Sequence, residues 1–317
     1  MHKRIEYIDI ARGMLIFLVV LGHSGFPSRY IYWFHMPAFF VLSGLVYKDI
    51  VSRADFVKYV LKRIHRLIFP YLYYFVLLSI FTFVFSIQRI DNIVTIVKSL
   101  AMGGAHLSGY YSIFWFITTY FLVQILFAFL QFLRLKKSGI LVVLLASYLL
   151  AHYYVRFGNT YGITYDAWWS PRFIFTCLPY FGSGYFLKNI IMKIKPTRFL
   201  VLLTIEFAAS LFILSELSIL NYSLDLRSGF YNSYLWDFVI PVFFSFATII
   251  LSKVIFGTYI GNIFSYLGKR SMVIMYLHPI AATVTKFGDW YFYLLLGVCI
   301  PIIITKTLEY KGTIKNY

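Results

Sequence analysis

The sequence predicts an all-α protein that crosses a membrane about ten times. Of its 317 residues, 61% are hydrophobic and 21% aromatic, whereas only 13% are charged. Soluble proteins carry about a quarter charged residues. The apolar residues also form long blocks separated by short basic segments, and roughly 20 apolar residues cross the hydrocarbon core of a bilayer. These observations exclude a soluble fold and predict one integral membrane domain over residues 1–317.

The apolar blocks place the predicted spans along the chain. They lie near residues 8–25, 30–47, 67–87, 113–133, 138–155, 171–187, 199–220, 237–252, 271–287 and 291–306. The first block follows Lys3 and Arg4, as the apolar part of a secretory signal would. However, Asp9 and Arg12 interrupt its approach and no small-residue cleavage site follows. We therefore expect a permanent helix at 8–25.

The distribution of basic residues predicts the orientation of these spans. With the N-terminus in the cytoplasm, 21 lysine and arginine residues fall on the inner side and 6 on the outer side. Inner loops of membrane proteins are enriched in these residues. The sequence thus predicts an N-in, C-in protein of the cell (cytoplasmic) membrane. Because the net charge of +17 is spread over many short segments, it does not indicate a nucleic-acid partner.

No metal site is expected from the sequence. Cys177 and Cys299 each lie inside an apolar block, so neither a disulfide nor a thiolate site is indicated. The histidine residues have no carboxylate or thiolate partners at ligand spacing.

Ionisable residues inside a membrane are costly and are therefore functional candidates. The first span carries Asp9, Arg12 and His23. At 100° per residue, the eleven steps from Arg12 to His23 leave a rotation of only about 20°, so the two share a face roughly 16 Å apart. Asp9 precedes Arg12 by three residues, a spacing that predicts an ion pair. The alternative is that Asp9 and Arg12 anchor the helix at the inner interface and His23 caps it at the outer one.

The second span, 30–47, contains His35, Pro37 and Ser43. A proline frees a backbone carbonyl, and we expect a bend that brings His35 toward His23. A packing kink with a hydrogen-bonded histidine is the alternative. In the ninth span, His278 precedes a proline. It has either a functional role or a structural one, in which its imidazole forms a hydrogen bond with a serine or tyrosine of a neighbouring helix.

Arg63 and Arg66 belong to the basic segment 48–66, which is predicted to be a cytoplasmic loop. Three residues apart on a helix, they point to one side and can bind a phosphate group. Binding of anionic lipid headgroups by the same positive charges is the alternative. Trp115, at the outer end of its span, is by position most often an interface anchor.

These residues suit an acyl donor that enters from the cytoplasm. Coenzyme A has a phosphate-rich head for basic residues and a long, thin arm that can carry a thioester into a helix bundle. At the end of the arm, His23 could take the proton of an acceptor hydroxyl or briefly carry the acyl group, because imidazole titrates near neutral pH and is a competent nucleophile. Asp9 would orient Arg12.

The motifs also resemble those of a known family. The sequence YIDIARGMLIFLVVLGHS has Arg12 and, after ten residues, His23; WFHMPAFFVLSGLVYK follows, and then Arg63-x-x-Arg66. This combination resembles the membrane acyltransferase-3 family and looks most like its fucose 4-O-acetylase-like branch. The close match covers about the first 75 residues. FWFI at 114–117 and YLHP at 276–279 are less specific echoes.

The resemblance implies transfer of an acetyl group from cytoplasmic acetyl-CoA to a hydroxyl of a surface polysaccharide or lipid-linked glycan. Carried over by position, it assigns catalysis to His23, with Asp9, Arg12 and His35. Donor phosphates are assigned to Arg12, Arg63 and Arg66, and substrate contacts to Ser43, Trp115 and His278. The competing hypothesis is a transporter or flippase of a glycan or lipid intermediate, in which the polar face of the first span lines a conduction path.

Overall fold

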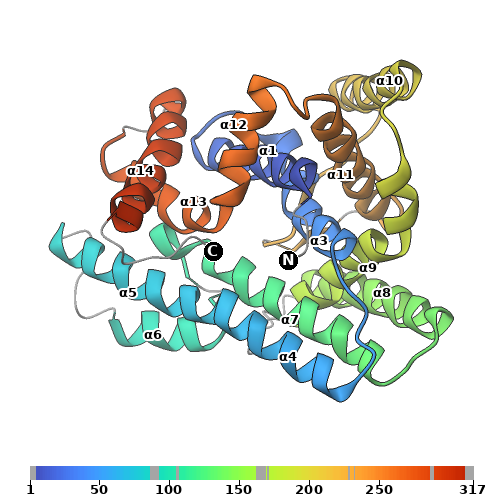
Figure 1. Cartoon of the computed structure of the whole chain (residues 1–317), viewed down its shortest axis with the longest axis horizontal. Coiled ribbons are helices and arrows are strands. Elements are labelled where there is room, and N and C mark those ends of the chain that lie inside the picture. The colour runs from blue at the N-terminus through green and yellow to red at the C-terminus, as the bar shows by residue number, and fades with distance from the viewer. Residues whose placement is uncertain are drawn as a thin grey trace. The chain divides into compact units, whose positions relative to one another are not determined.

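A computed structural model of the chain describes residues 5–85, 93–104, 107–161, 169, 171–227, 229–231, 233–285 and 289–310. The predicted inner residues Lys3 and Arg4, the outer residues Arg89 and Lys286, and the basic tail 311–317 lie outside these ranges. Helices dominate the described part, with one two-stranded sheet beside them (Figure 1). The predicted all-α architecture is confirmed.

The chain divides into two compact units, and each is described separately. The first comprises residues 1–42, 189–224 and 235–317, and the second comprises 43–188 and 225–234. The first unit contains α1 (Glu6–His23), α2 (Arg29–Tyr32), the start of α3 (His35–Leu45), α10 (Arg198–Glu216), α11 (Trp236–Val254), α12 (Tyr259–Lys269), α13 (Ser271–Leu277), the 3₁₀ segment η4 (His278–Thr283) and α14 (Trp290–Tyr310).

The second unit contains the remaining elements. They are α4 (Arg53–Arg63), the π-helical segment η1 (Ile64–Ile68), α5 (Phe69–Val84), α6 (Ile93–Ala101), the 3₁₀ segment η3 (Gly109–Tyr111), α7 (Phe114–Phe132), α8 (Lys137–Tyr161) and most of α9 (Pro171–Lys193). Strands β1 (Leu224–Asp225) and β2 (Phe230–Tyr231) pair with each other.

Six helical stretches in the described residues are long and apolar enough to cross a membrane. They are Arg53–Val84, Gly109–Phe132, Lys137–Gly158, Arg198–Glu216, Trp236–Val254 and Trp290–Thr307. Large apolar side chains such as Phe83, Leu145 and Leu202 are exposed on them, as expected for helices that face lipid. The count of ten spans and their orientation stay predictions.

The predicted second and ninth spans are each divided. Residues 30–47 form α2 and α3, which are separated at Trp33 and Phe34, so the break precedes Pro37 instead of falling on it. The described residues of the range 271–287 form the short helix α13 (Ser271–Leu277) and then η4 (His278–Thr283). Pro279 explains the second change, because a proline has no N–H to continue the α-helical pattern.

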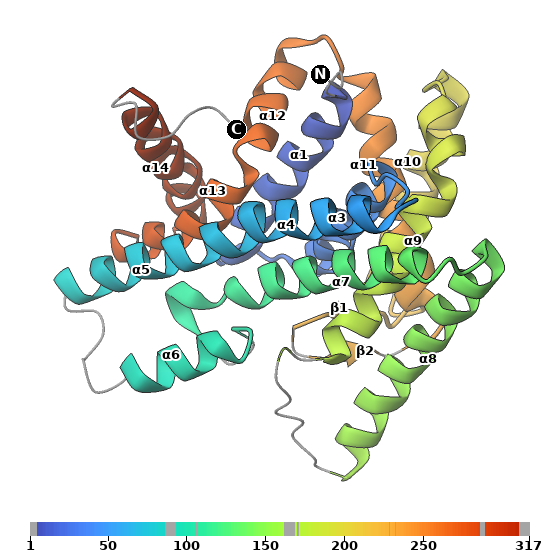
Figure 2. The same ribbon diagram turned by 60° about the horizontal axis from the view of Figure 1, so that its bottom comes forward.

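Residues 48–66, predicted as a loop, are mostly helical. Ser52 caps α4 in a reciprocal arrangement with Asp55: each side chain accepts a hydrogen bond from the other residue's backbone N–H. Helix α4 continues through η1 into α5 as one long ribbon that runs beside α7 (Figure 2). The hydroxyl of Tyr59 donates to Oε1 of Gln124 on α7 at 3.3 Å. Apart from Lys48, the lysine and arginine residues of this segment therefore lie on helical residues of a stretch that packs against α7.

In the first unit, α1 and α12 lie side by side (Figure 1). Glycine residues allow their backbones to touch. A Cβ atom on Gly13 would lie 1.8 Å from the carbonyl oxygen of Phe264, and one on Gly268 would lie 1.8 Å from that of Asp9. Small residues permit such close approach of membrane helices. Residues 253–270, predicted as a connection between spans, thus contain a helix that fixes the position of α1.

Lys253, at the end of α11, connects three helices of the first unit. Its Nζ atom donates to the carbonyl oxygens of Ile191 at 2.6 Å and Ile194 at 2.8 Å, at the C-terminal end of α9. It also lies 4.9 Å from the ring centroid of Tyr7 on α1. A positive charge is favourable at a helix C-terminus, where carbonyl groups lack helical partners.

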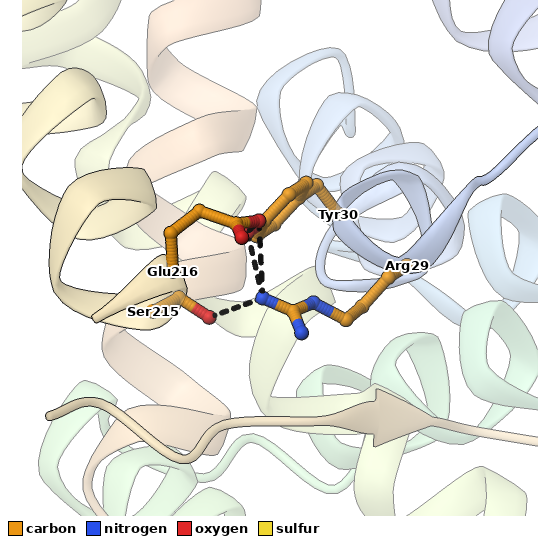
Figure 3. Close-up of polar contacts among 4 residues, drawn as sticks. All are labelled: Arg29, Tyr30, Ser215 and Glu216. Atoms are coloured by element: carbon orange, nitrogen blue, oxygen red, sulfur yellow. Dashed lines mark hydrogen bonds and ion pairs between the residues drawn. The ribbon is translucent and has the colours of Figure 1, made fainter. Parts of the chain in front are cut away.

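A polar cluster joins α2 to the end of α10 (Figure 3). Arg29 Nη2 donates to Oγ of Ser215 at 2.9 Å and lies 3.5 Å from Oε1 of Glu216. The hydroxyl of Tyr30 also donates to Glu216. The side chains of Arg29 and Glu216 are 53% and 69% exposed, and such ion pairs contribute about 1 kcal/mol at most. The cluster holds α2 in place without forming an enclosed site.

Candidate active site

Asp9 and Arg12 form the ion pair predicted on the first span. Nη1 of Arg12 lies 3.4 Å from Oδ1 of Asp9, and the two side chains are 29% and 2% exposed. Because Asp9 lies in the first turns of α1, its carboxylate also interacts favourably with the positive end of the helix dipole. The predicted ion pair is confirmed, whereas the catalytic and donor-binding roles of these two residues stay predictions.

His23, the last residue of α1, lies against His278. The centroids of the two imidazole rings are 5.2 Å apart and their planes are inclined at 46°. The side chain of His23 is exposed, whereas His278 is completely buried at the junction of α13 and η4. The fold of the first unit therefore places the histidine of the first span beside that of the YLHP sequence.

The hydrogen bonds of His278 determine its tautomer. Its Nδ1 atom lies 3.0 Å from the carbonyl oxygen of Ile274 and 2.8 Å from that of Met275. Carbonyl oxygens only accept hydrogen bonds, so Nδ1 carries the proton and Nε2 keeps its lone pair. The Nε2 atom is buried and has no hydrogen-bond partner among the described residues. His278 thus holds a buried proton-accepting nitrogen beside His23.

His35 begins α3 and is buried. Its Nδ1 lies 2.7 Å from the carbonyl oxygen of Ile31, and its ring packs edge-on against Tyr32 with centroids 5.1 Å apart. These contacts agree with the alternative interpretation of His35, which is a hydrogen-bonded histidine at a packing kink. The approach of His35 to His23 stays a prediction, and the imidazole that the structure places against His23 is that of His278.

Arg63 and Arg66 lie in different environments of the second unit. Arg63, the last residue of α4, is half-buried, and its Cζ atom lies 4.8 Å from the ring centroid of Tyr59. Its Nε atom is buried without a hydrogen-bond partner in the described part of the chain. Arg66 is exposed on η1. A π-helical segment is rare and frequently marks a functional site, which favours a binding role for this segment.

An aromatic cluster that sequence reasoning missed adjoins Arg63. The ring of Tyr47, which follows α3, is 2% exposed, and its hydroxyl has no hydrogen-bond partner among the described residues. It packs against the rings of Tyr59 at 5.5 Å, Phe127 at 5.3 Å, Phe181 at 5.5 Å and Tyr185 at 5.9 Å. Only the aromatic richness of the sequence hinted at it.

Ser43 and Trp115 are both buried in the second unit. Ser43 precedes Gly44, where a Cβ atom would lie 2.0 Å from the carbonyl oxygen of Phe181, so α3 and α9 pack closely there. The ring centroid of Trp115 lies 4.9 Å from that of Phe173. Trp115 is therefore packed inside the unit instead of serving as an exposed interface anchor. Contact of either residue with a substrate stays a prediction.

A metal-binding cluster is not found in the ranges that the structure describes: no three histidine, cysteine, aspartate or glutamate side chains come together there.

Comparison with known proteins identifies one family. A family model described as an acyltransferase domain matches residues 5–309. No curated protein and no solved structure matches the chain. The family match covers all the site residues discussed above, whereas the resemblance to the fucose 4-O-acetylase-like branch stays a prediction.

Proposed function

Since the chain belongs to the acyltransferase-3 family, we propose that it moves an acetyl group from cytoplasmic acetyl-CoA to a hydroxyl of a surface polysaccharide or lipid-linked glycan. The family makes the chain an acyltransferase, and together with the apolar helices it makes the chain a multi-pass membrane protein. The donor, the acceptor, the cytoplasmic membrane and the N-in, C-in orientation belong to the proposal.

The observation that carries the proposal within the structure is the imidazole pair at the end of α1. His23 is exposed and can meet a substrate, while His278 beside it is buried. In the proposed reaction, a ring nitrogen of His23 takes the proton of the acceptor hydroxyl, and the oxygen of that hydroxyl attacks the carbonyl carbon of the thioester. The carbon–sulfur bond then breaks, and the leaving thiolate receives the proton from His23. One ester and one free thiol result.

The basic residues supply donor binding in this proposal. Arg63 offers a buried Nε–H without a partner among the described residues, and a guanidinium matches the geometry of phosphate oxygens. Arg66 adds an exposed positive charge. Arg12, held by Asp9 at 3.4 Å, contributes a positive charge on the same helix as His23. Ser43 and Trp115 remain candidates for substrate contacts, and His35 remains a candidate for catalysis.

The proposal is tested by replacing His23 in cells that produce the protein and the acceptor glycan. We expect His23→Ala to abolish O-acetylation, measured by mass spectrometry as loss of the acetyl mass from the glycan, at unchanged protein level. His152→Ala is the control, because His152 is a histidine outside the proposed site: it is buried and packs against Tyr148 and Tyr234 in the second unit. Normal acetylation in the His23 variant would refute the assignment.

The same cells distinguish the competing hypothesis. A glycan transporter would lose export of the glycan in the His23→Ala variant, with acetylation of the exported molecules unchanged. In the acyltransferase proposal, export continues and the exported glycan lacks acetyl groups. Labelled acetyl-CoA added to isolated membranes tests the donor, since label must then enter the glycan fraction in a His23-dependent manner.

A further inference from the structure

We propose that His278 is the positioning residue for His23: its Nε2 atom accepts a hydrogen bond from His23 and thereby directs the other nitrogen of His23 to the acceptor hydroxyl. This inference rests on the proposed acyl transfer and assigns His278 a role other than substrate contact. It starts from the 5.2 Å separation of the two ring centroids and from the complete burial of His278.

The backbone of α13 fixes the ring of His278. Its Nδ1–H donates to the carbonyl oxygens of Ile274 and Met275, and its backbone N–H donates to Ile274 as well. These carbonyls belong to the last turn of α13, and that of Met275 has no helical partner because Pro279, four residues on, has no N–H. Two hydrogen bonds from one nitrogen to the carbonyl oxygens of two consecutive residues restrict rotation of the ring. The direction of the Nε2 lone pair is therefore set by the fold.

The Nε2 atom needs a hydrogen-bond donor. Buried polar atoms in proteins are almost always hydrogen-bonded, and each exception requires an explanation. Nε2 of His278 has no partner within the described residues, and the centroid of the His23 ring lies 5.2 Å from that of the His278 ring. The side chain of His23 is exposed, and a neutral imidazole carries one N–H. We infer that this N–H is directed at Nε2 of His278.

Close packing excludes water from the ring of His278. A Cβ atom on Gly297 of α14 would lie 2.7 Å from Cγ1 of Val20 and 3.5 Å from the Cβ atom of His278. The missing side chain thus lets α14 pack against both α1 and η4. In such a water-excluded position, a hydrogen bond to a charged group is stronger than in water.

The chemical consequence concerns the charge on His23. When His23 takes the hydroxyl proton it becomes an imidazolium ion with two N–H groups. One is directed at the substrate oxygen and later returns its proton to the leaving thiolate, and the other stays bonded to Nε2 of His278. His278 neither gains nor loses a proton. A base oriented by a third group in this way is a recurring arrangement in acyl-transfer enzymes.

Two substitutions of similar shape test the two ring nitrogens of His278 separately. In His278→Asn, the amide nitrogen replaces Nδ1 and keeps the bond to the α13 carbonyls, but no acceptor faces His23. In His278→Gln, the amide oxygen reaches the place of Nε2 and restores an acceptor. We expect kcat to fall by roughly 10- to 100-fold in the Asn variant with KM unchanged, and the Gln variant to recover most of the loss. Equal kcat in wild type and the Asn variant would overturn the proposal.

A second measurement does not require acyl transfer. Diethyl pyrocarbonate modifies neutral imidazole, and a bond donated by His23 to His278 makes the opposite nitrogen more nucleophilic. We expect His23 to be modified more slowly in the Asn variant than in wild type and the Gln variant. Peptide mass spectrometry measures the rate of modification, and the comparison uses proteins of equal thermal stability. Equal rates in all three proteins refute the hydrogen bond. If wild type transfers no acyl group while the rates differ, the proposed function fails and the His23–His278 hydrogen bond stands.

Discussion

Replacement of Gly13 by alanine tests whether the close contact of α1 and α12 positions the site. The added Cβ atom would lie 1.8 Å from the carbonyl oxygen of Phe264, 2.6 Å from its carbon and 3.0 Å from the nitrogen of Gly268. All three are backbone atoms, so no side chain can move aside. Ordinary contact begins at 3.4 Å, and the backbones must therefore separate by roughly 1.6 Å.

The expected cost follows from this separation. Extra methylene groups in a packed interior cost about 1–3 kcal/mol, and a contact with backbone lies at the upper end of that range. Alanine stabilises a helix by about 1 kcal/mol relative to glycine, and this gain offsets part of the packing cost. We expect a net loss of about 2 kcal/mol, and a loss of acyl transfer because α1 carries both Arg12 and His23.

The assay is thermal unfolding of the purified protein in detergent. Size-exclusion chromatography of samples heated to different temperatures measures how much folded protein remains. The control is Gly139→Ala on α8, where the nearest atom to the added Cβ is that of Leu135 at 3.8 Å. We expect the control to keep the wild-type midpoint or exceed it. A Gly13→Ala protein as stable as the control would show that the two helices do not depend on their backbone contact, and the reasoning would be refuted.

Two further predictions concern basic residues. Lys253→Met keeps the apolar stem but removes the donor to the carbonyls of Ile191 and Ile194, so we expect the thermal assay to show a loss of about 2 kcal/mol; an unchanged midpoint would contradict the capping role. Arg63→Lys removes the Nε–H and the planar guanidinium that stacks on Tyr59, and we expect KM for acetyl-CoA to rise about tenfold, more than in Arg66→Lys. A larger effect in the exposed Arg66 would contradict this order.

The sequence predicted those parts of the site that lie within one helix. Asp9 and Arg12 are three residues apart, and local helix geometry alone brings them together, as the 3.4 Å contact confirms. The pairing of His23 with His278 joins the first span to the ninth, and it depends on how α1, α13 and α14 pack. Hydropathy and spacing contain no information about that packing, so the sequence could identify both histidines without placing them together.

The differences in helix boundaries have a related cause. Residues 48–66 are too polar for a span by hydropathy, yet they form α4 because Ser52 caps it and α7 covers one of its faces. Residues 253–270 were expected to connect two spans, but Gly268 allows α12 to pack directly on α1. In both places tertiary contact determines the structure, and a window of composition cannot detect it.

The position of α4 beside α7 also separates the two interpretations of the basic segment. Phe56 stacks on Phe132 at the end of α7, Tyr59 bonds Gln124, and Tyr71 packs against Phe114 at the start of α7. At 1.5 Å per residue, the 19 residues of α7 span about 28 Å, close to the thickness of the hydrocarbon core.

Arg63 follows Tyr59 by one helical turn and therefore lies along the middle of α7. We expect α7 to cross the membrane, and lipid headgroups would then not reach this position. A guanidinium at such depth is costly unless a partner or function compensates, and its Nε has no partner among the described residues. Lys58, by contrast, is exposed on α4 nearer the end that meets Phe132. We therefore expect anionic lipid to account for the charge at the start of α4, and a ligand that enters the protein to account for Arg63.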